Sequence, residues 1–242
     1  MEEPNCHLFV PAEVEIRTEA TVPIPEFQGS QCVGCGACIK ACHFHALALL
    51  GNRVLVFPEL CHSCGGCVLA CASGALREAQ HAIGHLEFRR NETVRLLSGI
   101  LNIGHAMAPP LIRKLRERIA PGSTAILDAP PGTACPMVTT VRGCDYVLLV
   151  TEPTPFGLHD LKLAVRTLRE IGTPQGVILN RADDESALIE EYCVTENIPL
   201  LMRIPFSRAV AEGYARGQRL LEVMPELRGE FERLLAKIGG NR

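Results

Sequence analysis

The sequence contains no long apolar run, no N-terminal signal pattern and no basic cluster. No segment approaches the roughly 18 consecutive apolar residues that a membrane-spanning helix needs. The start, MEEPNCHLFVPAEVE, has no charged region followed by an apolar stretch. Lysine and arginine are not interleaved with aromatic residues, and the formal net charge is only −3. These absences predict a soluble, cytoplasmic protein whose partners are neither membranes nor nucleic acids.

Cysteine, by contrast, is abundant, and eight of the twelve cysteines form two copies of the pattern CxxCxxCxxxC. The first copy is QCVGCGACIKAC and the second is LCHSCGGCVLAC. A shift of 29 residues, from Cys32 to Cys61, superimposes all four cysteines and also pairs Gly36 with Gly65. The chain therefore contains an internal repeat.

This spacing is typical of ferredoxins that hold two [4Fe-4S] clusters. Three closely spaced thiolates reach three irons of one cluster, and the fourth cysteine begins a helical turn and binds the other cluster. The predicted ligands of cluster 1 are Cys32, Cys35, Cys38 and Cys71, and those of cluster 2 are Cys61, Cys64, Cys67 and Cys42. Glycines between the cysteines let backbone N–H groups approach the cluster sulfurs: Gly34, Gly36, Gly65 and Gly66.

Two zinc sites and a disulfide framework are the alternatives. Tetrahedral zinc sites favour separated CxxC pairs over runs of four cysteines, and nothing in the sequence suggests a secreted chain. Because such clusters are damaged by oxygen, we expect a reducing compartment in an anaerobic or microaerobic prokaryote. His43 and Ala72 stand where ferredoxins usually have proline, after the fourth cysteine. His43 and His62 are more simply explained as solvated side chains than as hydrogen-bond donors to a cluster.

The rest of the chain, which is 47% hydrophobic overall, alternates strand and helix patterns. Strands are predicted at 124–128, 145–150, 176–180 and 200–204, and helices at 110–119, 158–171, 186–197 and 208–216, with Gly172 as a helix stop. This order predicts an α/β fold in which a mostly parallel sheet has helices on both faces. Short strands at 14–16, 53–57 and 85–89 flank the cysteines. We therefore expect an inserted ferredoxin-like α+β module at 13–90, within an α/β domain formed by 1–12 and 91–242, to which the chain returns at 96–103.

Asp128 follows an apolar segment in the sequence ILDAPPGT, where an acid can order magnesium or simply cap a helix. Further stretches are EEPNCHLF, LNIGHAMAPPLIRKLRE, DYVLLVTEPTPFGLHDLKLAV, GVILNRAD and IPFSRAVAEGYARG. Together they resemble the MinD/Mrp group of P-loop ATPases, in the subgroup with an inserted two-cluster ferredoxin domain. The resemblance implies that Asp128 is the Walker B acid, that Gly132 belongs to the switch and that Asn180 contacts adenine. A turn-forming role is the alternative for Asn180.

The glycine-rich phosphate loop of that family is missing from this sequence, which has no GxxxxGK[ST] motif and no Gly-Lys dipeptide. We therefore expect no ATPase activity and no catalytic residue in the chain as given, with ATP and magnesium bound only if a segment carrying the loop is present. The resemblance starts at residue 1, after the point where relatives have completed this loop. We favour a gene start placed too late over a paralogue without its ATPase half, because such a paralogue would lack a central strand.

Four cysteines lie outside the repeat. Cys135 follows Asp128 at a position similar to that of a bridging-cluster cysteine in the nitrogenase iron protein, but two subunits would supply only two thiolates. We therefore expect Cys135 to pack at a helix start. Cys6, Cys144 and Cys193 are isolated and are expected to be buried as small apolar residues.

The sequence thus predicts an iron-sulfur protein that exchanges single electrons with a redox partner, in the full-length family coupled to ATP binding and hydrolysis. A homodimer is compatible with this function. The alternatives are a carrier of Mrp type that delivers clusters to apoproteins and a regulatory ATPase of MinD type. Full cysteine ligation favours electron transfer, because a delivered cluster needs a labile site. The tail ELRGEFERLLAKIGGNR lacks the broad apolar face of a membrane-targeting helix.

Overall fold

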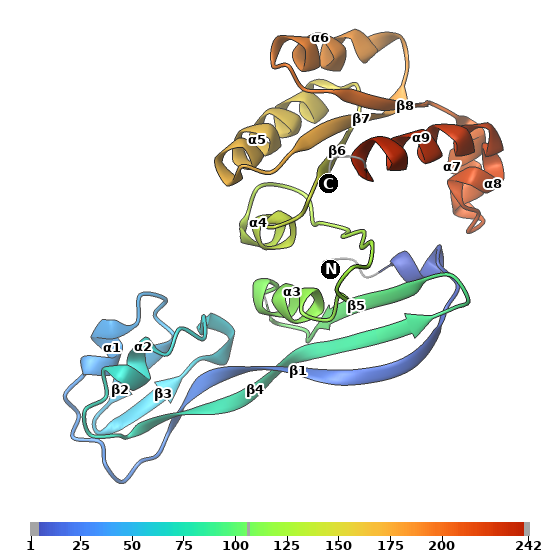
Figure 1. The fold of residues 1–242 in the computed structure, drawn as a ribbon. Coiled ribbons are helices and arrows are strands. Elements are labelled where there is room, and N and C mark those ends of the chain that lie inside the picture. The colour runs from blue at the N-terminus through green and yellow to red at the C-terminus, as the bar shows by residue number, and fades with distance from the viewer. Residues whose placement is uncertain (1–4, 106, 240–242) are drawn as a thin grey trace. The chain divides into compact units, whose positions relative to one another are not determined.

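The computed structural model describes residues 5–105 and 107–239, and the chain divides into two compact units (Figure 1). The first unit is Ala12–Ala125, and the second combines Asn5–Pro11 with 126–239. Residues 1–4, within the predicted segment 1–12, and residue 106, within LNIGHAMAPPLIRKLRE, lie outside the described residues. The domain boundaries predicted from the sequence, at 12/13 and 90/91, stay predictions.

The first unit is built on an antiparallel sheet with the strand order β1-β4-β5 (Figure 1). β1 (Glu13–Phe27) and β4 (Leu76–Arg90) pair along their whole length, and β5 (Arg95–Leu101) pairs with the second half of β4. The short strands predicted at 14–16 and 85–89 are therefore parts of two strands of 15 residues each. Pro23 and Pro25 do not interrupt β1, because an edge strand needs no N–H donor on its outer side.

Helix α3 (Pro109–Arg116) packs on the three-stranded part of this sheet, close to the predicted helix 110–119. Leu111, with 1% of its surface exposed, packs against a core of Ala20, Val22, Ile83 and Leu86. A Cβ atom on Gly99 of β5 would lie 2.9 Å from the Leu111 side chain. The close approach of α3 therefore requires glycine at this position.

Glu87 of β4 carries a buried charge. Because it alternates with Leu86 and Phe88 along the strand, it points away from the core beneath α3. Only 3% of Glu87 is exposed, and its carboxylate accepts hydrogen bonds from Arg17 and from Arg89, the latter at 2.9 Å. Burial raises the pKa of Glu87, but the two guanidinium groups outweigh burial and hold this pKa below its ordinary value.

The cysteine repeat lies at the other end of the β1–β4 ribbon (Figure 1). It contains α1 (Ala37–Ala41), the hairpin of β2 (Leu47–Leu50) with β3 (Arg53–Val56), a 3-10 helix (Pro58–Leu60) and α2 (Gly66–Leu69). The 29-residue shift also holds for backbone pairing, since Phe27 pairs with Leu76 as Val56 pairs with Leu47. The two halves of the repeat therefore fold as copies of each other.

The second unit contains a parallel sheet with the order β6-β7-β8, formed by Val147–Thr151, Gln175–Ala182 and Leu200–Pro205. Val177 and Leu179 of β7 pack against α5 (Pro155–Ile171) and α6 (Ala187–Thr195), whereas Ile178 packs with Leu227 and Leu234 on the other face. The remaining helices are the 3-10 helices Cys6–Leu8, Asp184–Ser186 and Pro225–Leu227, and α4 (Cys135–Val141), α7 (Arg208–Ala215), α8 (Leu220–Val223) and α9 (Arg228–Gly239). The predicted parallel strands with helices on both faces are confirmed for this unit. Gly172 ends α5 with a φ of 78°, as predicted.

The strand predicted at 124–128 is wrong. Residues 123–130 are irregular, and 88% of the Ile126 surface is exposed. An apolar run becomes a strand only where a neighbouring strand pairs with its N–H and C=O groups. No described strand pairs with this segment, and β6 is an edge of its sheet.

Candidate functional site

Both cysteine runs contain left-handed turns between their cysteines. Gly36 and Gly65, at the N-termini of α1 and α2, have φ angles of 70° and 71°. Gly34 and Ser63, which are also equivalent in the repeat, have φ angles of 68° and 54°. Glycine adopts this region without strain, so the CxxCxxC loops can turn tightly enough to bring three cysteines together.

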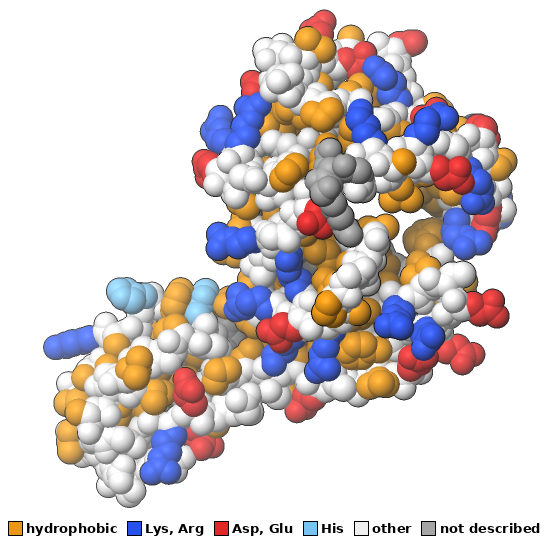
Figure 2. Space-filling model, viewed as in Figure 1, with side chains coloured by type: hydrophobic (Ala, Val, Ile, Leu, Met, Phe, Trp, Pro, Cys, Tyr) orange, Lys and Arg blue, Asp and Glu red, His pale blue; other side chains and the backbone are white. Residues whose placement is uncertain are grey.

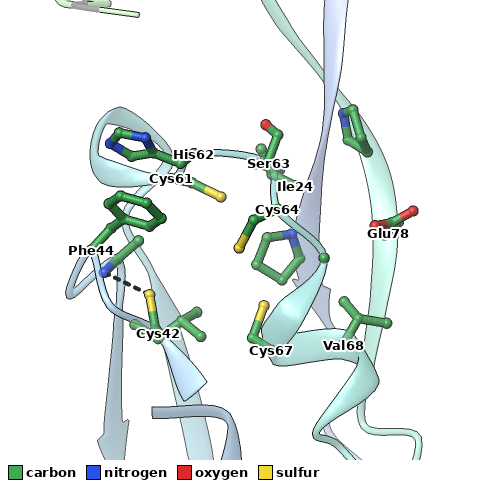
Figure 3. A pocket seen from close by; sticks show the side chains of 15 residues that line it. Ile24, Cys42, Phe44, Cys61, His62, Ser63, Cys64, Cys67, Val68 and Glu78 are labelled. Carbon is green, nitrogen blue, oxygen red and sulfur yellow. Dashed lines mark hydrogen bonds between the residues drawn. The ribbon is translucent and has the colours of Figure 1, made fainter. Parts of the chain in front are cut away.

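Four cysteines line one cavity, part of which is open to solvent. Figure 3 shows the sulfurs of Cys61, Cys64 and Cys67 directed into this space from one loop and that of Cys42 directed into it from the other run. Apolar side chains form part of its walls: Pro23, Ile24, Pro25, Leu47 and Val68. His62, Ser63 and Glu78 line it as well. The structure thus brings together the four residues predicted to hold cluster 2.

Cys38, Cys32 and Cys71 form the corresponding group in the other half of the repeat. Burial raises the pKa of the Cys38 thiol, and the nearby Cys71 and Cys32 add to this rise. Cys35, the fourth predicted ligand of cluster 1, is exposed. Here too the last cysteine of one run lies near cysteines of the other, namely Cys38 and Cys32.

Two of the thiols around the cavity, those of Cys61 and Cys67, resist ionisation. Burial raises the pKa of Cys61 and of Cys67, and for both thiols a charge on Cys42 raises it further. A metal site with thiolate ligands must supply the compensating positive charge, which the irons of a cluster carry. The donor set therefore fits such a group chemically.

Two of the sulfurs make hydrogen bonds within their own chain. The Ala46 N–H donates to Cys42 Sγ at 3.3 Å, and the Ser73 hydroxyl lies 3.6 Å from Cys71 Sγ. Burial raises the pKa of the Cys71 thiol, but the Ser73 hydroxyl and backbone amides outweigh burial and lower it. The amides are those of Leu76, Ala75 and Gly74. This environment stabilises a thiolate at Cys71.

Phe44 stacks on His62 beside the cavity, with ring centroids 3.5 Å apart and an interplanar angle of 7° (Figure 3). Both side chains are exposed, so the pair lies on the solvent side of the cluster 2 cysteines. His43 is exposed as well, and Figure 2 shows histidine side chains at the surface of this end of the first unit. His62 is thus solvated on one face, as expected, while its other face is covered by Phe44.

Three residues with functional contacts escaped sequence reasoning: Phe44, Ser73 and Gln31. The signal that could have found them is a comparison of the two halves of the repeat. The 29-residue shift places Phe44 opposite Ser73 and Gln31 opposite Leu60. The two halves differ in chemistry at both of these positions.

The nucleotide candidates lie on separate elements of the second unit. Asp128 and Gly132 belong to the irregular segment before α4, whereas Asn180 lies in β7. Asp128 is exposed and accepts a hydrogen bond from Cys6 Sγ at 3.2 Å. Burial raises the pKa of the Cys6 thiol, and Asp128 raises it further.

The other isolated cysteines differ in exposure. Cys135 begins α4 and is exposed, Cys6 and Cys144 are half-buried, and Cys193 is buried in the core formed by α5 and α6. Full burial, expected for Cys6, Cys144 and Cys193, is therefore correct only for Cys193.

No three His, Cys, Asp or Glu side chains within residues 5–105 and 107–239 converge closely enough to hold a single metal ion. In a [4Fe-4S] cluster each thiolate binds a different iron, so the ligands surround a cube instead of converging on one atom. None of the described helices is long and apolar enough to cross a membrane.

Comparison with known proteins supports an iron-sulfur, ferredoxin-like region. Residues 24–72 match the family described as the 4Fe-4S dicluster domain. Two similar proteins, both from Methanocaldococcus jannaschii, are the uncharacterized proteins MJ0579 and MJ0578. MJ0579 is 23% identical over 186 residues, which are 76% of this chain and 64% of the relative. MJ0578 is 28% identical over 152 residues, which are 62% of this chain and 53% of the relative, so both matches span less than two thirds of the relatives' lengths.

Proposed function

We propose that this protein is an electron carrier with two [4Fe-4S] clusters and crossed ligation. Cys32, Cys35, Cys38 and Cys71 hold cluster 1, and Cys61, Cys64, Cys67 and Cys42 hold cluster 2. The observation that carries this proposal is the single cavity into which Cys42 projects together with three cysteines of the other run. A [4Fe-4S] cluster supplies one-electron redox chemistry when bound.

The chain's own residues support this role in three ways. Eight thiolates leave no position open on either cluster, which favours retention over delivery to another protein. Backbone N–H groups and the Ser73 hydroxyl donate to ligand sulfurs and stabilise their negative charge. Ile24, Val68 and the other apolar residues limit the contact of water with the part of the cavity that they line. These features suit a cluster that changes charge while its ligands stay in place.

Coupling to ATP is a further part of the proposal and belongs to the MinD/Mrp resemblance. The parallel sheet β6–β8 with helices on both faces is compatible with it. In this scheme Asp128 orders the magnesium ion, Gly132 belongs to the switch and Asn180 contacts the adenine base, once a phosphate-binding loop is supplied. The redox partner is a protein of the same cytoplasmic compartment, and a homodimer is the assembly in which nucleotide would act.

The metal content of anaerobically reconstituted protein tests the proposal. We expect about eight irons and about eight sulfides per chain, the content of two cubes. The dithionite-reduced protein should show an EPR signal from reduced clusters. Stoichiometric zinc, or iron for a single cluster, would overturn the two-cluster assignment.

A further inference from the structure

The two halves of the repeat differ beside their fourth cysteine. Ser73 stands two residues after Cys71, and Phe44 stands two residues after Cys42. The Ser73 hydroxyl lies 3.6 Å from Cys71 Sγ, within hydrogen-bond reach for sulfur. A ligating thiolate carries no proton, so the hydroxyl must be the donor. Phenylalanine has no donor to offer Cys42.

The turn that carries Ser73 is held in place by a side chain of the other run. When the Gln31 amide nitrogen faces this turn, it donates to the carbonyl oxygens of Ser73 at 3.0 Å and Gly74 at 3.1 Å. Leu60 occupies the equivalent position in the other half, and 50% of its surface is exposed. The Ser73 turn is therefore fixed by hydrogen bonds that the Phe44 turn cannot make.

Phe44 has a different effect on its half of the repeat. Its ring stacks on His62, and both side chains line the cavity of Cys42 and the second run. The aromatic pair covers part of the cavity that water would otherwise reach. The crossed ligand Cys71 thus has a hydroxyl group beside its sulfur, whereas the cavity of Cys42, which Ser63 and Glu78 also line, is partly covered by aromatic rings.

Both differences should make the reduction potential of cluster 1 higher than that of cluster 2. Reduction adds a negative charge, which a donor to the ligand sulfur stabilises and apolar shielding disfavours. We infer that Ser73 is a tuning residue that makes the cluster of Cys32, Cys35, Cys38 and Cys71 the one with the higher potential. This inference rests on the proposed function. It implies that one electron received by cluster 2 passes to cluster 1, which is reduced as cluster 2 is reoxidised.

Redox titration followed by EPR tests the inference on the reconstituted full chain. The wild type should show two midpoint potentials. Ser73→Ala should shift the higher one to a more negative value and leave the lower one unchanged. Ser73→Thr retains the hydroxyl and should keep the wild-type value. Gln31→Leu keeps Ser73 but releases its turn, so it should shift the same potential by a smaller amount.

Substitutions of Phe44 give an independent test. Phe44→Ser places a hydroxyl beside Cys42, and Phe44→Ala removes the ring without adding a donor. Both should raise the lower potential, and Phe44→Ser should raise it more. A higher potential that stays fixed in both Ser73→Ala and Gln31→Leu, or a shift of the lower potential instead, would overturn the inference. A wild-type titration without two reducible clusters would contradict the proposed function itself, before any variant is compared.

Discussion

Cys42 and Cys61 belong to different cysteine runs, yet their side chains line the same cavity. Cys71 of the second run likewise lies near Cys38 of the first. In the proposed ligation, each run completes the four-cysteine site of the other. A change in one loop should consequently be detected at the cluster of the other loop.

We expect Cys42→Ala to damage the cluster of Cys61, Cys64 and Cys67 and to spare the other cluster, with a loss of up to about four irons. Iron analysis and EPR of the reduced protein measure this. Adding Cys64→Ala should change little, because both substitutions affect the same cluster, whereas adding Cys35→Ala should damage both clusters. Cys144→Ala, outside the repeat, is the control and should retain full iron content. Crossed ligation is refuted if Cys35→Ala adds nothing to Cys42→Ala.

Glu87→Gln should destabilise the first unit by about 3 kcal/mol near neutral pH, because it leaves the charge of Arg89 without its buried carboxylate. Chemical unfolding followed by circular dichroism measures the change. Glu190→Gln removes the exposed pair with Arg203 and should leave the unfolding midpoint almost unchanged. Equal effects of the two substitutions would show that burial of Glu87 does not matter.

The contribution of Glu87 should also depend on pH. Its folded-state pKa is lowered, so its stabilisation is present above the ordinary glutamate pKa of about 4.3 and is lost as pH falls through the folded value. The difference in unfolding free energy between wild type and Glu87→Gln should therefore be constant near neutrality and shrink below about pH 4.3. A difference that grows on acidification would contradict the lowered pKa.

Gly99→Ala should destabilise the protein by about 1–3 kcal/mol, because the added methyl group overlaps the Leu111 side chain and displaces α3. Thermal or chemical unfolding gives the value. Gly229→Ala in α9 is the matched control, since its nearest contact is the end of Arg233 at 3.8 Å. Alanine favours helix there by up to about 1 kcal/mol. A neutral Gly99→Ala would show that α3 shifts without cost.

The 242-residue chain should neither hydrolyse ATP nor bind it more tightly than about millimolar, because it lacks the lysine loop. One or two hydrogen bonds from Asn180, worth about 1 kcal/mol each, do not offset the entropy lost on association. Isothermal titration with ATP and magnesium tests this, and micromolar affinity would contradict it. Translation of the DNA upstream of Met1 complements the test, since an in-frame Gly-Lys loop would identify a longer ATPase.

Sequence patterns predicted those elements whose stabilising interactions lie within a short segment or recur in both halves of the repeat. The cysteine spacing predicted that Cys42 lies with Cys61, Cys64 and Cys67 around one cavity, because both halves of the repeat have the same backbone geometry. The pattern of α5, with Gly172 as its stop, predicted a helix whose cap and apolar face are encoded within its own residues. The strands β6, β7 and β8 were predicted nearly at their observed limits.

The errors concern partners distant in sequence. Residues 124–128 have the apolar content of a strand, but pairing depends on a neighbour that a local pattern does not reveal. The lengths of β1 and β4 were underestimated, because each strand is extended by its pairing with the other across the whole cysteine repeat. The contact of Ser73 with Cys71 and the stacking of Phe44 on His62 likewise require the folded loops.

The bulge between Ala20 and Thr21 lies where β5 stops pairing with β4, at Gly84. On one side of this point the sheet has three strands and a supporting helix, and on the other side only β1 and β4 continue toward the cysteines. A two-stranded ribbon twists more readily than a wider sheet. The bulge marks the point at which the ribbon leaves the three-stranded sheet, and the seven residues of β1 beyond it span about 24 Å. A rotation of about 10° at the bulge would move the cysteine end of the ribbon by about 4 Å.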